Sequence, residues 1–208
     1  MSFFNPTHLI NTYGAAGLII VILIESGILP IPLPGDSLLF LAGFFASTSA
    51  AGNDHPHLNL GVVVFGTLAA AVIGAQFGYI IGSRYGERLF KPDAKLFKTK
   101  YLQQAEVYFE RRGARSVVIA RFIPFLRTIV PMVAGASSMK ARSFLIANLA
   151  GAVVWTTGIS LLGYFAGDTI GEDNIDKYLL PIVAAIVVLS MIPPLLEYRN
   201  HKRDQTAH

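Results

Sequence analysis

The chain has 208 residues, of which 53% are hydrophobic and only 14% are charged. Soluble domains carry roughly 25% charged residues, so this composition indicates an integral membrane protein and argues against a soluble one. The net charge is +4, but the basic residues lie beside apolar segments, which favours membrane topology and anionic lipid over nucleic acid as the explanation. The absence of cysteine excludes disulfides and thiolate metal sites.

The chain opens with an apolar stretch at residues 9–29 that is long enough to cross a membrane. Residues 1–83 contain no lysine or arginine, so the stretch lacks the basic region of a cleavable signal peptide and is expected to stay in the mature protein. Residues 34–50 are short for a span, because a helix needs about 20 residues to cross. Between them lies the sequence PIPLPGD, which is incompatible with a regular helix and contains Pro30, Pro32, Pro34, Gly35 and Asp36.

This broken apolar region predicts a re-entrant hairpin that enters the membrane from outside, since irregular backbone at membrane depth must be surrounded by protein or water. The alternative, in which residues 9–29 and 34–50 both cross fully, stays open because no basic residue marks that end. Residues 60–82 then predict a transmembrane helix, rich in small residues that let helices approach closely.

A basic connection follows at residues 84–115, with nine lysines and arginines against four acidic residues. Within it, residues 92–113 place apolar side chains at helical spacing with charged ones opposite, and Gly113 fits the position after a helix end. The pattern predicts an amphipathic helix on the cytoplasmic leaflet, with a solvated linker helix as the alternative.

The next apolar stretch, residues 116–139, contains two arginines and is interrupted by Pro124 and Pro131. Residues 143–167 and 179–196 are further spans, with Trp155 and several tyrosines available as interface anchors.

Charge decides the expected topology of this second half. The positive-inside rule places residues 84–115 and the basic tail (Arg199, Lys202 and Arg203) in the cytoplasm, and the acidic loop 168–177 outside. With two spans after it, residues 116–139 keep the tail inside only if they re-enter and do not cross. We therefore expect a second hairpin that dips in from the cytoplasm.

Internal repetition supports a pairing of the two hairpins. PLPGDSLLFLAG (32–43) aligns without gaps to PFLRTIVPMVAG (124–135), and GYIIG (78–82) matches GYFAG (163–167). Inverted repeats with broken helices are typical of transporters. The predicted fold is an all-α polytopic membrane protein with one domain, residues 1–208. It comprises a first repeat at about 9–83, the amphipathic linker, a second repeat at about 116–167, and a C-terminal transmembrane helix at about 179–196.

Glu25 and Asp36 from the first repeat, and Arg121 and Arg127 from the second, are ionisable residues within apolar stretches. Such residues are functional candidates, the alternative being salt bridges that only close one hairpin against the other. A helix break at Pro124 lets both guanidiniums converge, and two arginine forks suit a phosphate. A carboxylate balanced between burial and these arginines can exchange a proton near neutral pH.

Two polar residues in the predicted spans, Gln76 and Asn148, are expected to hydrogen-bond between helices, with a ligand role as the alternative. The five histidines show no metal-ligand spacing. We predict no metal and no cofactor.

The motifs ESGILPIPLPGD and RFIPFLRTIVPMVAG, the latter followed by Phe144, resemble those of the DedA family of bacterial inner-membrane proteins, whose eukaryotic relatives carry the VTT domain. The resemblance covers roughly residues 9–196. It implies an inner-membrane protein that moves a phosphate-bearing lipid, such as undecaprenyl phosphate or a phospholipid, between leaflets with coupling to the proton motive force.

The same resemblance places the acids that family members need at Glu25 and Asp36, and their arginines at Arg121 and Arg127. From the residues themselves we expect the arginines, which stay charged, to bind the lipid phosphate, and a carboxyl group to carry the proton. Asp36 is the first choice because it follows Pro34-Gly35 at the hairpin's break, and Glu25 is the second. The hairpins would break at Pro32, Pro34, Gly35, Pro124 and Pro131.

Three alternatives to lipid transport remain at this stage. The first is a proton-dependent transporter of a small anion, which would share the site. The second is a polyprenyl pyrophosphate phosphatase, which is disfavoured because the arginine stretch offers Thr128 but no serine or histidine as nucleophile or base. The third is a structural membrane-assembly factor. We predict a protein that is not an enzyme, whose partners are a lipid and protons, and the sequence is compatible with a homo-oligomer.

Overall fold

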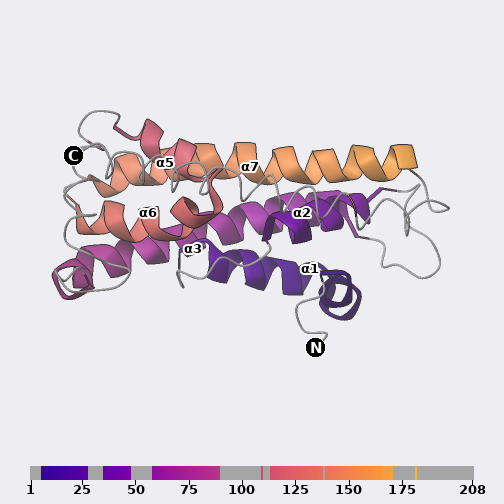
Figure 1. Ribbon diagram of the computed structural model, residues 1–208, viewed down its shortest axis with the longest axis horizontal. Coiled ribbons are helices and arrows are strands. Elements are labelled where there is room, and N and C mark those ends of the chain that lie inside the picture. Colours follow the sequence, from indigo (N-terminus) through magenta and orange to yellow (C-terminus); the bar gives the residue numbers. More distant parts are fainter. Residues whose placement is uncertain are drawn as a thin grey trace, which may run out of the picture.

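The computed structural model describes residues 6–27, 35–47, 58–89, 113–137 and 139–170, together with Phe109 and Pro181. In these ranges every regular element is a helix, which confirms the all-α class (Figure 1). The helices are α1 (Pro6–Glu25), α2 (Gly35–Phe44), α3 (Leu60–Leu89), α5 (Arg115–Ala120), α6 (Pro124–Ala136) and α7 (Ala141–Ile170). The predicted amphipathic helix, apart from Phe109 and Gly113, and the predicted last span, apart from Pro181, lie outside the described residues, as do Pro30, Pro32 and Pro34.

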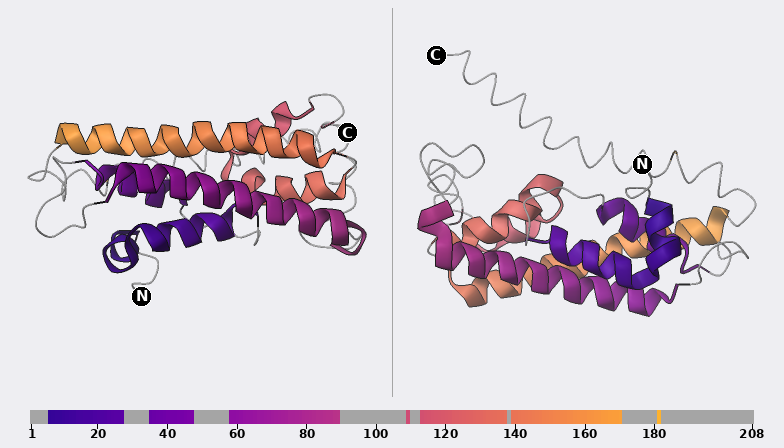
Figure 2. Two further views of the ribbon diagram at one scale, coloured as in Figure 1. Left: turned by 180° about the vertical axis from the view of Figure 1, so that it is seen from behind. Right: turned by 90° about the horizontal axis from the view of Figure 1, so that it is seen from below.

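Two long helices form the frame of the molecule. α3 and α7 each contain 30 residues and run antiparallel along the long axis (Figures 1 and 2). A helix of that length measures about 45 Å, which exceeds the roughly 30 Å of a bilayer's hydrocarbon core. Both are apolar enough to cross a membrane. The predicted spans 60–82 and 143–167 are therefore confirmed as apolar helices, and each helix continues beyond the predicted end.

The remaining helices are shorter than α3 and α7, and the chain departs from helical geometry within α1 and between α5 and α6. α1 has a kink at Gly14, whose φ of 55° lies in the left-handed region that favours glycine. α5 and α6 are separated by a turn in which Ile123 is extended, with φ −112° and ψ 111°. The residue before a proline disfavours the helical conformation, so Pro124 ends one helix and begins the next. We also predicted a helix break at Pro131, but α6 continues through this residue.

α2 packs along α7 through a close backbone contact. Gly43 of α2 faces the carbonyl group of Ser160, and Gly163 of α7 faces the carbonyl group of Phe40. A Cβ atom at either glycine would overlap the opposite backbone. Glycine at both positions therefore sets the distance between these two helices, as small residues do in membrane proteins.

α6 packs along α3 through the same kind of contact. Gly135 of α6 faces the carbonyl group of Tyr79, and Gly82 of α3 faces the carbonyl group of Met132. Gly135 corresponds to Gly43 in the sequence alignment of the two halves. By these contacts, however, Gly163 corresponds to Gly82, one helical turn beyond the match expected from the GYIIG and GYFAG segments. α2 and α6 lie toward opposite ends of the long helices (Figures 1 and 2).

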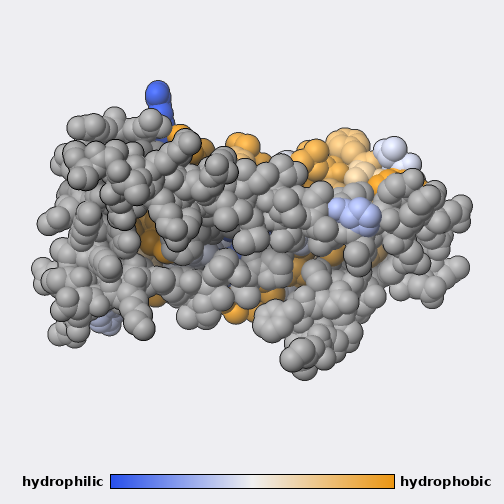
Figure 3. Space-filling view, in the orientation of Figure 1, coloured by the Kyte–Doolittle hydropathy of each residue, from blue (hydrophilic) through white to orange (hydrophobic). Residues whose placement is uncertain are grey.

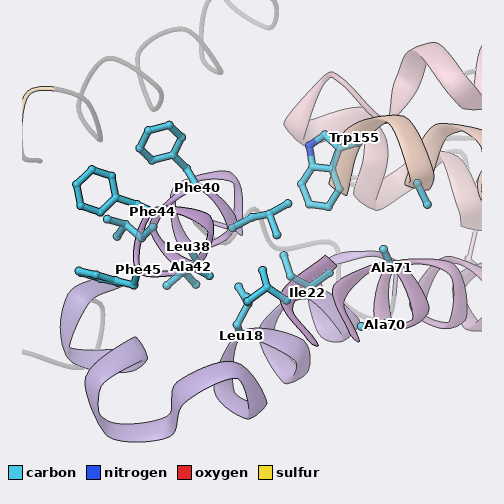
Figure 4. Packing of buried hydrophobic residues seen from close by; sticks show 14 residues of the cluster. Leu18, Ile22, Leu38, Phe40, Ala42, Phe44, Phe45, Ala70, Ala71 and Trp155 are labelled. Carbon is cyan, nitrogen blue, oxygen red and sulfur yellow. The ribbon is translucent and has the colours of Figure 1, made fainter. Parts of the chain in front are cut away.

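The largest apolar core surrounds α2, in which every residue except Asp36 is buried. Figure 4 shows this cluster, to which α1 contributes Leu18 and Ile22 and α7 contributes Trp155. A helix that is apolar all round belongs in the interior.

The long helices instead keep large apolar side chains on the outside, among them Phe65 and Phe77 of α3 and Leu162 and Phe165 of α7. Figure 3 shows apolar surface between the grey regions. Exposed apolar surface on this scale indicates contact with lipid.

Candidate functional site

Arg127 is held between two carboxylates, one from α1 and one from α2. It lies in the first turns of α6; its Nη1 donates to Oδ1 of Asp36 at 2.6 Å, and its Nη2 donates to Oε1 of Glu25. The side chains of Arg127, Glu25 and Asp36 are 6%, 2% and 13% exposed. Two acids from the first half of the chain thus pair with one arginine from the second half, through separate nitrogens of its guanidinium fork.

The local backbone explains why both acids reach this point. Glu25 is the last residue of α1, and Asp36 lies in the first turn of α2. Gly35 has no side chain, and a Cβ atom there would overlap Oε2 of Glu25. Glycine at the start of α2 therefore lets the Glu25 carboxylate approach a helix N-terminus, where negative charge is favoured. Gly27 turns the chain after Glu25, with a φ of 142° that favours glycine.

Arg121 has a different kind of partner. It follows the last residue of α5 and is 7% exposed. Its Nη1 donates to Oδ1 of Asn148 on α7, and Nδ2 of Asn148 donates to the carbonyl oxygen of Val72 on α3 at 3.2 Å. Within the described part of the chain, Arg121 forms no salt bridge with a carboxylate. From the sequence we predicted that both arginines lie near the two acids, but in the structure both acids form their salt bridges with Arg127.

Trp155 contacts both arginines and hydrogen-bonds to Asp36. Its Nε1 donates to Oδ1 of Asp36 at 3.0 Å. The centroid of its ring lies 4.8 Å from Cζ of Arg127 and 5.8 Å from Cζ of Arg121, which is within cation–π range. We expected an interface anchor, but Trp155 is buried in the charged cluster. Its position two helical turns after Asn148 puts both on one face of α7, a signal that the sequence contained.

A small cavity borders this cluster between α5, α6 and α7. Its lining consists of Val117, Ala120, Arg121, Arg127, Val130, Pro131, Phe144 and Asn148. Among the residues that the structure describes, the Nε atoms of both arginines are buried without a hydrogen-bond partner. Buried polar groups are nearly always hydrogen-bonded, so each arginine retains a donor for a further acceptor. The cavity has a volume of about 10 Å³, room for a single water molecule, so a phosphate would have to widen it to contact the two guanidinium groups.

The predicted interhelical polar residues behave differently from each other. Asn148 makes the expected hydrogen bonds between helices. The Oε1 atom of Gln76, by contrast, is buried without a partner among the described residues. Thr128 is fully buried beside Arg127 in the sequence.

Comparison with known proteins now places the chain in a family. Residues 33–165 match the VTT domain model. The chain is 37% identical over 202 residues to Protein DedA of Escherichia coli, covering 94% of this chain and 88% of that protein. It belongs to the VTT-domain, or DedA, family. An uncharacterized membrane protein of Mycobacterium tuberculosis is also 37% identical over 190 residues, covering 89% of this chain and 80% of its own length. No solved structure shows a significant match.

The family match bears on the site and on location. The matched VTT region contains Asp36, Arg121, Arg127, Asn148 and Trp155, whereas Glu25 precedes it. These relatives include proteins named as membrane proteins, and the chain has two apolar helices of spanning length. The protein is therefore a DedA-family membrane protein.

Proposed function

We propose that this DedA-family protein moves a lipid with a phosphate-bearing headgroup between the leaflets of the bacterial inner membrane, and that protons are coupled to the movement. The observation that carries the proposal is the buried Arg127, paired with Glu25 and Asp36 beside a cavity that Arg121 also lines. Buried charges are costly in a membrane protein and mark substrate or ion pathways. The proposed activity is transport without chemical change to the lipid.

The guanidinium groups suit the phosphate. Arginine binds phosphate through two parallel N–H donors, stays charged at any relevant pH, and is weakly hydrated compared with lysine. In the structure, each Nη nitrogen of Arg127 donates one hydrogen bond to a carboxylate. On this proposal the small cavity widens to admit the phosphate, which then competes with these carboxylates for the same positive charge.

This competition supplies the proton coupling. When phosphate binds the arginines, their attraction for Glu25 and Asp36 weakens, and a buried carboxylate without a counter-charge favours its protonated form. Phosphate arrival thus promotes proton uptake, and phosphate release promotes proton loss. Such linkage between two ligands is reciprocal. A proton carrier must also exchange its proton with water. Asp36 is our first choice because its side chain is more exposed than that of Glu25, at 13% against 2%.

The arrangement of helices supports an inverted-repeat transporter. α2 on α7 and α6 on α3 use matching glycine–carbonyl contacts, and α3 and α7 are antiparallel. α2 and α6 contain 10 and 13 residues, too few to cross a bilayer alone. We infer that they belong to two re-entrant hairpins whose charged residues meet near the midplane, a common design for transport sites. The basic segments place the C-terminus in the cytoplasm on this proposal.

Reconstituted liposomes test the function. We expect the purified protein to exchange a fluorescent phosphatidic acid between leaflets, faster with an imposed pH gradient than without one. Protein-free liposomes and the Arg121→Gln variant should show only background exchange. Uptake of inorganic phosphate in place of lipid exchange would favour a small-anion transporter, release of phosphate would indicate an enzyme, and none of these activities would leave a structural role.

A further inference from the structure

The two arginines differ in the charge of their partners. Arg127 is compensated by the carboxylates of Glu25 and Asp36, whereas Arg121 hydrogen-bonds to the neutral amide of Asn148. Both side chains line the same cavity, and both arginines are buried. The two carboxylates and two guanidinium groups balance in number, but both carboxylates pair with Arg127, so Arg121 is the guanidinium without a carboxylate partner among the described residues.

Hydrogen-bond chemistry dictates the orientation of the Asn148 amide. A guanidinium group only donates, so the oxygen Oδ1 must face Arg121; a backbone carbonyl only accepts, so the nitrogen Nδ2 must face Val72. An ionised aspartate could satisfy Arg121 but would present an acceptor to the Val72 carbonyl. The neutral amide of Asn148 thus bonds to Arg121 through its oxygen and to the Val72 carbonyl of α3 through its nitrogen. It makes both hydrogen bonds without adding a negative charge.

We propose that Asn148 is a positioning residue that fixes Arg121 without neutralising it, so that the phosphate of the lipid binds first at Arg121. This inference rests on the proposed function and assigns a different role to each arginine. Arg121 receives the anion, and Arg127 keeps the two carboxylates in place until the anion competes for them. A headgroup that consists of phosphate alone suits such a site better than a zwitterionic one, whose cationic part would be repelled by the Arg121 guanidinium, which has no carboxylate partner among the described residues.

The single tryptophan of the chain provides the assay. Trp155 lies 5.8 Å from Cζ of Arg121 and 4.8 Å from Cζ of Arg127, so its fluorescence should change when an anion binds there. The probe is dihexanoyl phosphatidic acid, titrated into purified full-length protein in a neutral detergent at pH 7. Dihexanoyl phosphatidylcholine serves as the zwitterionic comparison.

Three variants separate positioning from simple structural support. Asn148→Asp adds a carboxylate that pairs with Arg121. Asn148→Leu removes both hydrogen bonds but leaves Arg121 charged. Asn59→Asp makes the same chemical change at an exposed residue before α3 and should bind the probe as the unmodified protein does. Thermal unfolding of each variant shows whether it is folded.

We expect Asn148→Leu to weaken probe binding roughly tenfold and Asn148→Asp roughly 100-fold, because a charge-assisted hydrogen bond is lost in the first and the anion's counter-charge is cancelled in the second. A purely structural role predicts the reverse order, since leucine loses more hydrogen bonds than aspartate. Equal or better binding by Asn148→Asp than by Asn148→Leu overturns the inference.

Two further results complete the test. If Asn148→Asp does not fold, Asn148→Leu decides: saturable but weaker binding supports the inference, and unchanged or abolished binding in a folded protein overturns it. If the unmodified protein gives no saturable response to phosphatidic acid, the proposed function itself fails at the binding step. That failure is distinct from a normal response in which the Asn148 variants keep the wrong order.

Discussion

Arg127→Lys is the sharpest test of whether the buried cluster needs a guanidinium fork or only a positive charge. Arg127 donates through Nη1 to Asp36 at 2.6 Å and through Nη2 to Glu25, so two carboxylates on different helices are held by two different nitrogens. A lysine ammonium has one nitrogen on a flexible stem and cannot reproduce this geometry. It would keep one close pair and leave the other carboxylate without its partner.

The expected cost follows from that loss. A hydrogen bond to a charged group contributes about 1.5–3 kcal/mol, and leaving a carboxylate unpaired in a buried site adds to the penalty. We therefore expect Arg127→Lys to lower the free energy of unfolding by about 2–4 kcal/mol, taken between these two effects. Transport of the phosphate lipid should fall to background, since the ammonium lacks the bidentate contact with phosphate.

The assay pairs denaturant unfolding in detergent with leaflet exchange in liposomes. Arg142→Lys is the matched control, because Arg142 is exposed at the start of α7 and should tolerate the change in both measurements. Unchanged stability and full exchange in Arg127→Lys would refute the reasoning, since charge alone would then suffice.

Three other predictions follow from the same structure. Asp36→Asn should still bind the lipid phosphate but lose its response to a pH gradient; an unchanged pH response in leaflet exchange would favour a passive scramblase. Cysteines introduced at Arg115 and Lys140 should be labelled from the same side of the membrane, because the α5–α6 segment is proposed to re-enter, and labelling from opposite sides would end that proposal. Gly135→Ala should destabilise the protein by about 1–3 kcal/mol through overpacking, whereas Gly158→Ala, which has nothing within 4 Å of its added Cβ, should not; equal unfolding midpoints for the two would contradict the close contact of α6 with α3.

The sequence alone was sufficient for properties that depend on local composition. Long apolar runs fix where α3 and α7 can form, because crossing a membrane requires about 20 apolar residues whatever the rest of the chain does. The cost of burying charge likewise singles out Glu25, Asp36, Arg121 and Arg127 without any structure. The break at Ile123 follows from the proline after it, which restricts the backbone of its own neighbour.

Only the tertiary structure decided which of these groups meet. Arg127 pairs with residues 91 and 102 positions away in the chain, and no local pattern encodes such pairings. The amide partner of Arg121 and the indole donor to Asp36, 119 residues apart, also depend on how α7 packs against α2 and α3. The sequence match of GYIIG with GYFAG pairs Gly82 with Gly167, but in the structure Gly82 corresponds to Gly163, one helical turn earlier. The correspondence is set by glycine–carbonyl contacts between helices, which the sequence match does not reveal.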